Sequence, residues 1–294
     1  GGLGVQAEET ARDVAAELNG EAQRAFLVDV ARRADGARLH RLAYWAYGEI
    51  AARGGPSEQL LAVRSRLAEL ALVVGDTAGA QESYGILEAS YAAGTAERRQ
   101  AAAARVALAI REAEPAEAVS QLEVYRCEFP EAPELDGLAA AAATRLLEAG
   151  DAAAADRVLA GVTGPRSGLV RARMALARGE TAQARSALLA AAPRLSGAEA
   201  TRTIALATLI GRLGADGVQL LGTALDRLSA GGPAGAVAAL VDGSGALPAA
   251  ERAAVLGFAA NVAEGAGLAA DAERVQRMLI AEHPTAPETP AALL

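Results

Sequence analysis

The sequence predicts an all-α protein built from antiparallel helical hairpins, and three observations support this fold class. Of the 294 residues, 52% are hydrophobic but only 3% are aromatic, and Ala and Leu supply most of the apolar share. This composition favours helices, because strands need β-branched and aromatic side chains. Runs of about 10 to 18 residues with helical character follow one another, each ended by a short Gly, Pro or Asp break. Breaks of about two to five residues make neighbouring helices antiparallel, because so short a connection cannot carry the chain elsewhere.

The expected helices follow from these breaks in chain order, and no strand pattern interrupts them. They cover residues 7–18, 21–34, 37–53, 57–74, 77–92, 96–112, 115–128, 134–149, 151–161, 167–178, 181–192, 197–213, 216–229, 233–242, 249–264 and 268–282.

Many of the hairpins share a register in which a glycine at the turn is followed five residues later by an alanine. The pairs are Gly75 and Ala80, Gly150 and Ala155, Gly179 and Ala184, Gly231 and Ala236, and Gly267 and Ala272. The glycine can take a positive φ where the first helix ends, and the alanine lets the second helix approach the first closely. We therefore expect these alanines to lie between packed helices.

The spacing of these alanines has the period of a helical-hairpin repeat. With Ala118 added to the series, successive intervals are 38, 37, 29, 52 and 36 residues, and most lie near a period of about 34. The 52-residue interval predicts an extra helix between residues 197 and 229. A short motif is also repeated between helices: FPEAPE at residues 129–134 is similar to HPTAPE at residues 283–288.

At this point the chain resembles the tetratricopeptide repeat (TPR) family, over roughly residues 57–294. The residues that carry the resemblance are Leu67, Ala68, Ala71, Gly75, Asp76, Ala80, Tyr84 and Leu87 in one unit, and Ala260, Gly267, Ala272, Leu279 and Pro284 in another. Ala and Leu replace most of the aromatic positions of the family pattern. The resemblance implies a right-handed, TPR-like α-solenoid over 57–294. Residues 1–56 are expected to be divergent helical repeats or a cap, continuous with that array.

The resemblance also implies a function, which is a non-catalytic scaffold or adaptor for other proteins or peptides. Pro-x-Ala-Pro-Glu junctions are similar to those of bacterial envelope lipoproteins built from these repeats. We therefore expect a role in an envelope assembly and a place in the periplasm or cell envelope, with the cytoplasm as the alternative. A carrier or chaperone that holds a lipid or an apolar peptide in its groove is the alternative function.

Charge and hydropathy exclude two other classes of partner. All 28 basic residues are Arg and the net charge is -8, so a general electrostatic grip on nucleic acid is not expected. The longest uncharged stretch, residues 228–241, is interrupted by Gly and Pro and falls short of the roughly 20 residues of a membrane span. No span is expected in this chain, although an anchor upstream stays possible.

Candidate partner-binding residues come from the helix positions that line the groove in the family. Carried over, these positions give Arg66, Glu69, Arg166, Arg173 and Asn261. Arg166 and Arg173 are seven residues apart and share one helix face, so the pair could grip a carboxylate or a phosphate. The alternative is that both arginines are solvated or paired with neighbouring acids.

A second set of candidates surrounds the one tryptophan. Trp45 lies near Arg38, Arg41 and Tyr44 in the expected helix 37–53, and a Trp among arginines can anchor a partner. The alternative is that Trp45 packs under an adjacent helix.

Catalytic signals are weak, so we predict no enzyme, no catalytic residue, no metal and no cofactor. His40 and His283 lie in different hairpins, and residues more than about two repeats apart in a repeat array rarely meet. Cys127 is expected to be a small buried hydrophobe at the end of its helix.

Overall fold

The computed structural model describes residues 2–54 and 57–289, and within these residues it contains helices and no strand. The helices are α1 (Gly2–Glu17), α2 (Gly20–Gly36), α3 (His40–Arg53), α4 (Ser57–Val74), α5 (Thr77–Ser90), α6 (Ala96–Glu112), α7 (Pro115–Glu128), α8 (Leu135–Glu148), α9 (Ala152–Leu159), α10 (Pro165–Ala177), α11 (Thr181–Ala191), the short 3-10 turn η1 (Ala192–Arg194), α12 (Gly197–Ile210), α13 (Ala215–Ser229), α14 (Pro233–Ser244), α15 (Ala249–Gly265) and α16 (Ala269–Glu282). The predicted all-α fold is confirmed, and every predicted helix is present. The ends move by a few residues, most at the first helix, which begins at Gly2.

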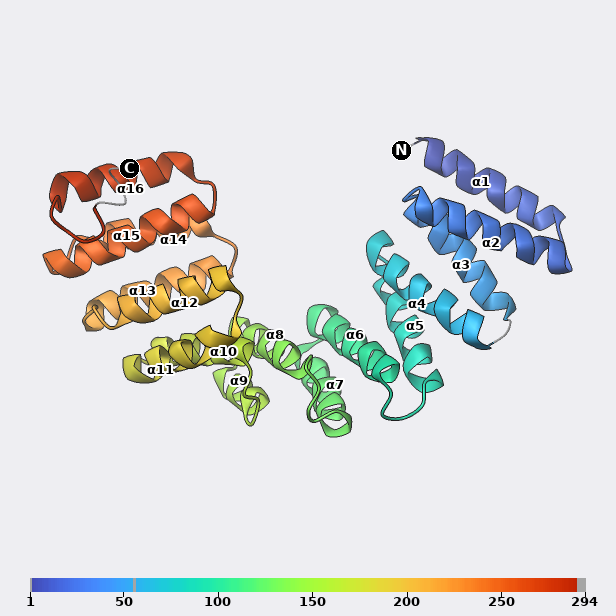
Figure 1. Ribbon diagram of the computed structural model, residues 1–294, viewed down its shortest axis with the longest axis horizontal. Coiled ribbons are helices and arrows are strands. Elements are labelled where there is room, and N and C mark those ends of the chain that lie inside the picture. Colours follow the sequence, from blue (N-terminus) through green and yellow to red (C-terminus); the bar gives the residue numbers. More distant parts are fainter. Residues whose placement is uncertain (1, 55–56, 290–294) are drawn as a thin grey trace. The chain divides into compact units, whose positions relative to one another are not determined.

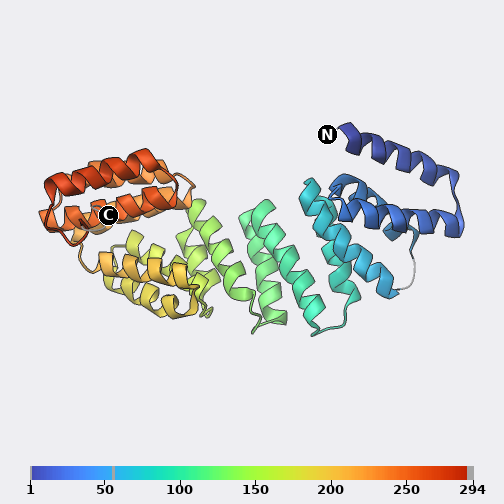
Figure 2. The ribbon, with the colours of Figure 1, turned by 45° about the horizontal axis from the view of Figure 1, so that its top comes forward.

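The chain divides into two compact units, one ending at Arg145 and the other beginning at Leu146. In the first unit, α2 to α6 each pack against the next helix, and α1 packs against α2 and α3. In the second unit, α10 packs against α11, and α13 to α16 pack in sequence (Figure 1, Figure 2). The division into an N-terminal segment 1–56 and an array 57–294 stays a prediction, because residues 1, 55, 56 and 290–294 lie outside the described residues.

The predicted turn glycines have the conformation that their role requires. Gly75, Gly150, Gly179, Gly231 and Gly267 have φ values between 71° and 84°. At the first of these turns, the backbone N–H of Asp76 donates to the carbonyl of Ala71 at 2.8 Å. This bond closes the end of α4 in the manner of a Schellman motif.

The alanines of the register are buried between helices, as predicted. Ala80, Ala155, Ala184 and Ala236 are fully buried, and Ala272 is 6% exposed. The aspartates of two turns also start the next helix, since Asp76 accepts a hydrogen bond from the N–H of Gly79 at 2.8 Å and Asp151 accepts one from Ala154 at 2.8 Å. A Gly-Asp pair therefore ends one helix and begins the next.

The turn between α2 and α3 has the same geometry without a glycine. Arg38 takes φ 56°, and the N–H of Leu39 donates to the carbonyl of Ala34 at 2.8 Å. Ala43, five residues after Arg38, is fully buried. The hairpin of α2 and α3 thus follows the same register, which the sequence hides because Arg stands where the other turns have Gly.

Replacing Arg38 with Gly is expected to raise the free energy of unfolding by about 1 kcal/mol. A left-handed backbone is costly for any residue with a Cβ and cheap for Gly. The measurement is the urea midpoint of the full chain, with Arg38→Ala as the control, because Ala removes the guanidinium and keeps the Cβ. Equal midpoints for the two variants would show that the backbone at Arg38 carries no strain.

The extra helix predicted from the 52-residue interval is present. Helix α12 packs against α11 and η1, whereas α13 reaches past it to pack against α10. Helix α12 is therefore inserted between the hairpin of α10 and α11 and the hairpin of α13 and α14.

The two similar junctions, at residues 129–134 and 283–288, are each preceded by the same kind of ion pair. Arg98 pairs with Glu128 (Nε to Oε1, 2.6 Å) before the first junction, and Arg252 pairs with Glu282 (Nη2 to Oε2, 2.5 Å) before the second. Each pair joins the start of one helix to the end of the next. Both segments therefore use the same ion pair to close a hairpin.

None of the described helices combines the length and the apolar character that crossing a bilayer requires.

Candidate functional site

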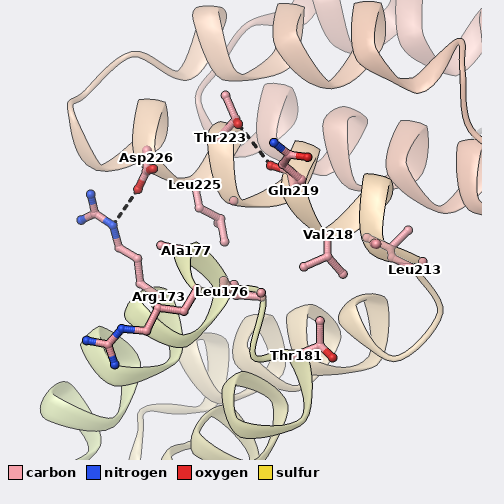
Figure 3. A pocket seen from close by; sticks show the side chains of 15 residues that line it. Arg173, Leu176, Ala177, Thr181, Leu213, Val218, Gln219, Thr223, Leu225 and Asp226 are labelled. Atoms are coloured by element: carbon pink, nitrogen blue, oxygen red, sulfur yellow. Dashed lines mark hydrogen bonds and ion pairs between the residues drawn. The ribbon is translucent and has the colours of Figure 1, made fainter. Parts of the chain in front are cut away.

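A pocket of about 670 Å³ lies in the second unit between α10, the turn after it and α13 (Figure 3). We call it the α10/α13 groove. Its apolar base includes Leu176 of α10 and Val218 of α13, which are 5% and 2% exposed. Both belong to one hydrophobic cluster with residues of α11 and α12. The groove follows from the insertion of α12, which takes the place next to α11 and brings α13 alongside α10.

Gly222 leaves one wall of the groove open. It lies in the interior of α13 and lines the groove, and a Cβ added there would meet no atom within 4 Å. A glycine inside a helix costs stability relative to alanine. At Gly222 the missing side chain widens the groove instead of allowing close packing.

Polar groups line the rim of the groove. The Nε of Arg173 donates to Oδ1 of Asp226 at 2.9 Å, at one end of the view in Figure 3. The hydroxyl of Thr223 donates to the carbonyl of Gln219 at 3.1 Å. Among the described residues, the side-chain amide of Gln219 has no hydrogen-bond partner. An amide both donates and accepts, so it can bind the backbone of an extended chain.

Arg166 and Arg173 are paired with acids of two different helices. Arg166 contacts Glu199 at the start of α12 (Nη1 to Oε1, 2.9 Å), whereas Arg173 contacts Asp226 of α13. Hydrogen bonds from Ser196 and Arg166 lower the pKa of Glu199. Both arginines are therefore paired with acids in this structure, and their role in binding a partner stays a prediction.

Arg66 joins two helices of the first unit. Its Nε and Nη2 donate to the two carboxylate oxygens of Asp35 at 2.8 and 2.5 Å, and its Nη1 pairs with Glu69. The bidentate hydrogen bonds hold the pKa of Asp35 below its usual value. Arg66 and Glu69 therefore contact each other, and their pairing connects the end of α2 to α4.

Tyr44 also makes a contact between hairpins. Its hydroxyl donates to Oδ2 of Asp76 at 2.6 Å, so the aspartate that caps α5 holds α3 as well. Burial and then the bond to Asp76 raise the pKa of Tyr44 to about 12.

Trp45 packs beneath α1, which is the alternative left open by the sequence. Its half-buried ring lies in the hydrophobic clusters that include Ala11 and Ala15, with the guanidinium carbon of Arg12 5.3 Å from the ring centroid. Arg38 and Arg41 are exposed, and neither has an ion-pair partner among the described residues. Only part of the Trp45 ring is accessible to a partner.

Asn261 is exposed on α15 and lines a second pocket of the second unit. This pocket has a volume of about 360 Å³ and lies between α12 and α15. Arg212 and Glu288 also line it, and they form an ion pair of 2.5 Å.

The prediction that Cys127 is buried is wrong, because its side chain is exposed. The buried positions of α7 are Ala118, Leu122 and Tyr125. Cys127 follows Tyr125 by two residues, or about 200° around the helix, and so faces solvent.

Sequence reasoning missed the α10/α13 groove, although the 52-residue interval was a signal for the insertion that forms it. A glycine inside the predicted helix 216–229 was a signal for Gly222, because it is costly there, whereas no signal marks Gln219.

No family model matches this sequence, and no curated protein is similar to it in sequence. Among solved structures, the chain is similar to the crystal structure of a tetratricopeptide repeat protein from Parabacteroides merdae, with 13% sequence identity and a TM-score of 0.47. The match covers 92% of this chain and 97% of that one. The repeated turns and hairpins described above give this chain an all-α fold of consecutive antiparallel helical hairpins.

Proposed function

We propose that this chain is a non-catalytic scaffold that binds a segment of another protein in the α10/α13 groove. The observation that carries the proposal is the open wall at Gly222 beside a buried apolar base and an unpaired amide at Gln219. The base can take an apolar side chain, and the amide can hold a backbone. Both lie on helices whose core side is packed, which keeps their geometry rigid.

The polar rim favours a protein segment over a lipid. Arg173, Asp226, Thr181 and Gln219 line the groove together with its apolar residues. Arg173 and Asp226 already bind each other, but a lipid chain would cover the side-chain amide of Gln219 without offering it a hydrogen bond, whereas a peptide backbone can both donate to it and accept from it. The alternative function is a carrier of a lipid or an apolar peptide, and the experiment must distinguish it from a scaffold that binds a protein segment.

A leucine at position 222 is the test, because it fills the groove without disturbing the core. Gly222→Leu should leave the stability equal or higher, since Leu favours a helix over Gly by about 0.8 kcal/mol. The wild-type chain, immobilised, is expected to recover a specific protein from an extract of the source organism. Gly222→Leu is expected to recover about tenfold less of it, because the segment loses its place in the groove.

Gly137→Leu is the matched control. Gly137 lies in α8 outside the groove, is exposed, and has open space around an added Cβ. It is expected to recover the partner at the wild-type level. Equal recovery by Gly222→Leu would contradict the proposal. Native mass spectrometry that finds a bound lipid in place of a protein would favour the carrier.

We further propose that the scaffold has a role in a bacterial envelope assembly. The resemblance of the Pro-x-Ala-Pro-Glu junctions to those of envelope lipoproteins supports it. Fractionation of the source cells, with detection of the endogenous protein, tests the location. Recovery in the envelope or periplasmic fraction is expected, and recovery in the cytoplasm alone would contradict it.

A further inference from the structure

A second groove, in the first unit, lies between α2 and α4 over α3, and has a volume of about 420 Å³. We call it the α2/α4 groove. Val28 of α2, Ile50 of α3, and Leu60 and Val63 of α4 form its apolar surface. Ile50 is buried, and the other three are half-buried. The groove is thus deep enough to receive an apolar side chain.

Two arginines of α2 border this apolar surface. Arg24, Val28 and Arg32 follow one another at intervals of four residues, which places them along one face of the helix. Among the described residues, neither Arg24 nor Arg32 has an ion-pair or hydrogen-bond partner. Arg66 and Arg173, by contrast, are each neutralised by an aspartate.

Among the acids that the structure describes near this groove, none pairs with Arg24 or Arg32. Asp29 pairs with Arg33, and Asp35 pairs with Arg66. Glu21 lies one turn before Arg24 and makes no ion pair within the described residues. No acid is among the described residues that line the groove. The described part of the lining therefore has two positive charges and no negative one.

Tyr47 adds a neutral donor beside Arg32. Its ring lines the groove and its hydroxyl has no hydrogen-bond partner among the described residues. Burial and then the negative charge of Asp35 raise the pKa of this hydroxyl, whereas the positive charges of Arg66 and Arg32 act in the opposite direction. At neutral pH the hydroxyl keeps its proton and can donate to a carboxylate.

We propose that the α2/α4 groove binds an acidic segment of a partner protein, in which an apolar side chain lies between two carboxylates. The apolar side chain would contact Val28 and Ile50, and the carboxylates would accept hydrogen bonds from Arg24 and from Arg32 with Tyr47. Hydrogen bonds between charged groups are stronger than neutral ones, and guanidinium binds carboxylate in a bidentate way.

The spacing of the two arginines sets the spacing of the acids. Eight residues separate Arg24 from Arg32, which is about 12 Å along a helix. An extended segment advances about 3.3 Å per residue, so the two acids should stand about four residues apart. This inference goes beyond the scaffold function, because it names the chemistry of a partner and a separate site.

A synthetic peptide array, probed with the purified full chain, tests the inference. The array varies the distance between two Glu residues and the residue between them, and includes the same peptides with Gln in place of Glu. Retention is expected to be highest where the acids are about four residues apart around Leu, Ile or Phe. Retention should fall as salt is raised, because salt screens exposed charges.

The double variant Arg24→Gln with Arg32→Gln is expected to bind the best peptide about tenfold more weakly, which corresponds to about 1.4 kcal/mol. The control is Arg157→Gln with Arg185→Gln, which removes the same charge from exposed arginines of α9 and α11 and should bind as the wild type does. Equal weakening by both double variants, or equal retention of Glu and Gln peptides, would overturn the inference. Gly222→Leu changes only the α10/α13 groove and should leave peptide retention unchanged. The proposals for the two grooves can therefore be contradicted independently of each other.

Discussion

Leu221→Ala is expected to lower the free energy of unfolding of the second unit by about 3 kcal/mol. Leu221 is fully buried on α13, in the cluster shared by α10, α11, α12 and α13. Removing its side chain loses the transfer free energy of the buried methyl and methylene groups and leaves a cavity between the helices. Urea unfolding of the full chain, followed by circular dichroism, measures the loss.

The control for this prediction is Leu189→Ala on α11. Leu189 is 43% exposed, so the same chemical change should alter the stability by no more than about 0.5 kcal/mol. If both variants lost the same free energy, the packing described for Leu221 would be wrong.

Ala80→Leu is expected to destabilise the first unit by about 2 to 3 kcal/mol for the opposite reason. Ala80 is fully buried on α5, in a cluster with Ala71 of α4 and Leu108 of α6. A larger side chain has no space there and would push the helices apart. The urea midpoint of the full chain reports the effect.

Ala78→Leu, on the exposed side of α5, separates overpacking from a change in helix propensity. Its stability should stay close to that of the wild type, because its side chain extends into solvent. An Ala80→Leu variant as stable as Ala78→Leu would disprove the role given to the small residues of the repeat.

The fold was predictable because it depends on local signals. A turn glycine such as Gly75 must take a positive φ, and an alanine such as Ala80 must lie where two helices meet, so both leave a mark at a constant spacing. The turn at Arg38 has the same geometry but was not predicted. Its conformation is held by the packing of α2 and α3 and not by the residue type.

The candidate sites were less predictable because their contacts join distant parts of the chain. The pairing of Arg66 with Asp35 spans 31 residues, and that of Arg173 with Asp226 spans 53. Periodicity places a residue on a helix face, but it does not identify the acid that faces it on another helix. For the same reason the sequence left open whether Trp45 binds a partner or lies beneath α1.

The pairing of Arg212 with Glu288 has a consequence for how the second unit unfolds. This ion pair spans 76 residues and joins the turn after α12 to the segment after α16, whereas most side-chain contacts between hairpins join neighbours. A linear array with nearest-neighbour contacts alone can lose hairpins one at a time from its end. A contact that closes so long a loop couples the last hairpin to the inserted helix. We therefore expect α12 to α16 to open together as one cooperative block, whereas α1 can fray by itself.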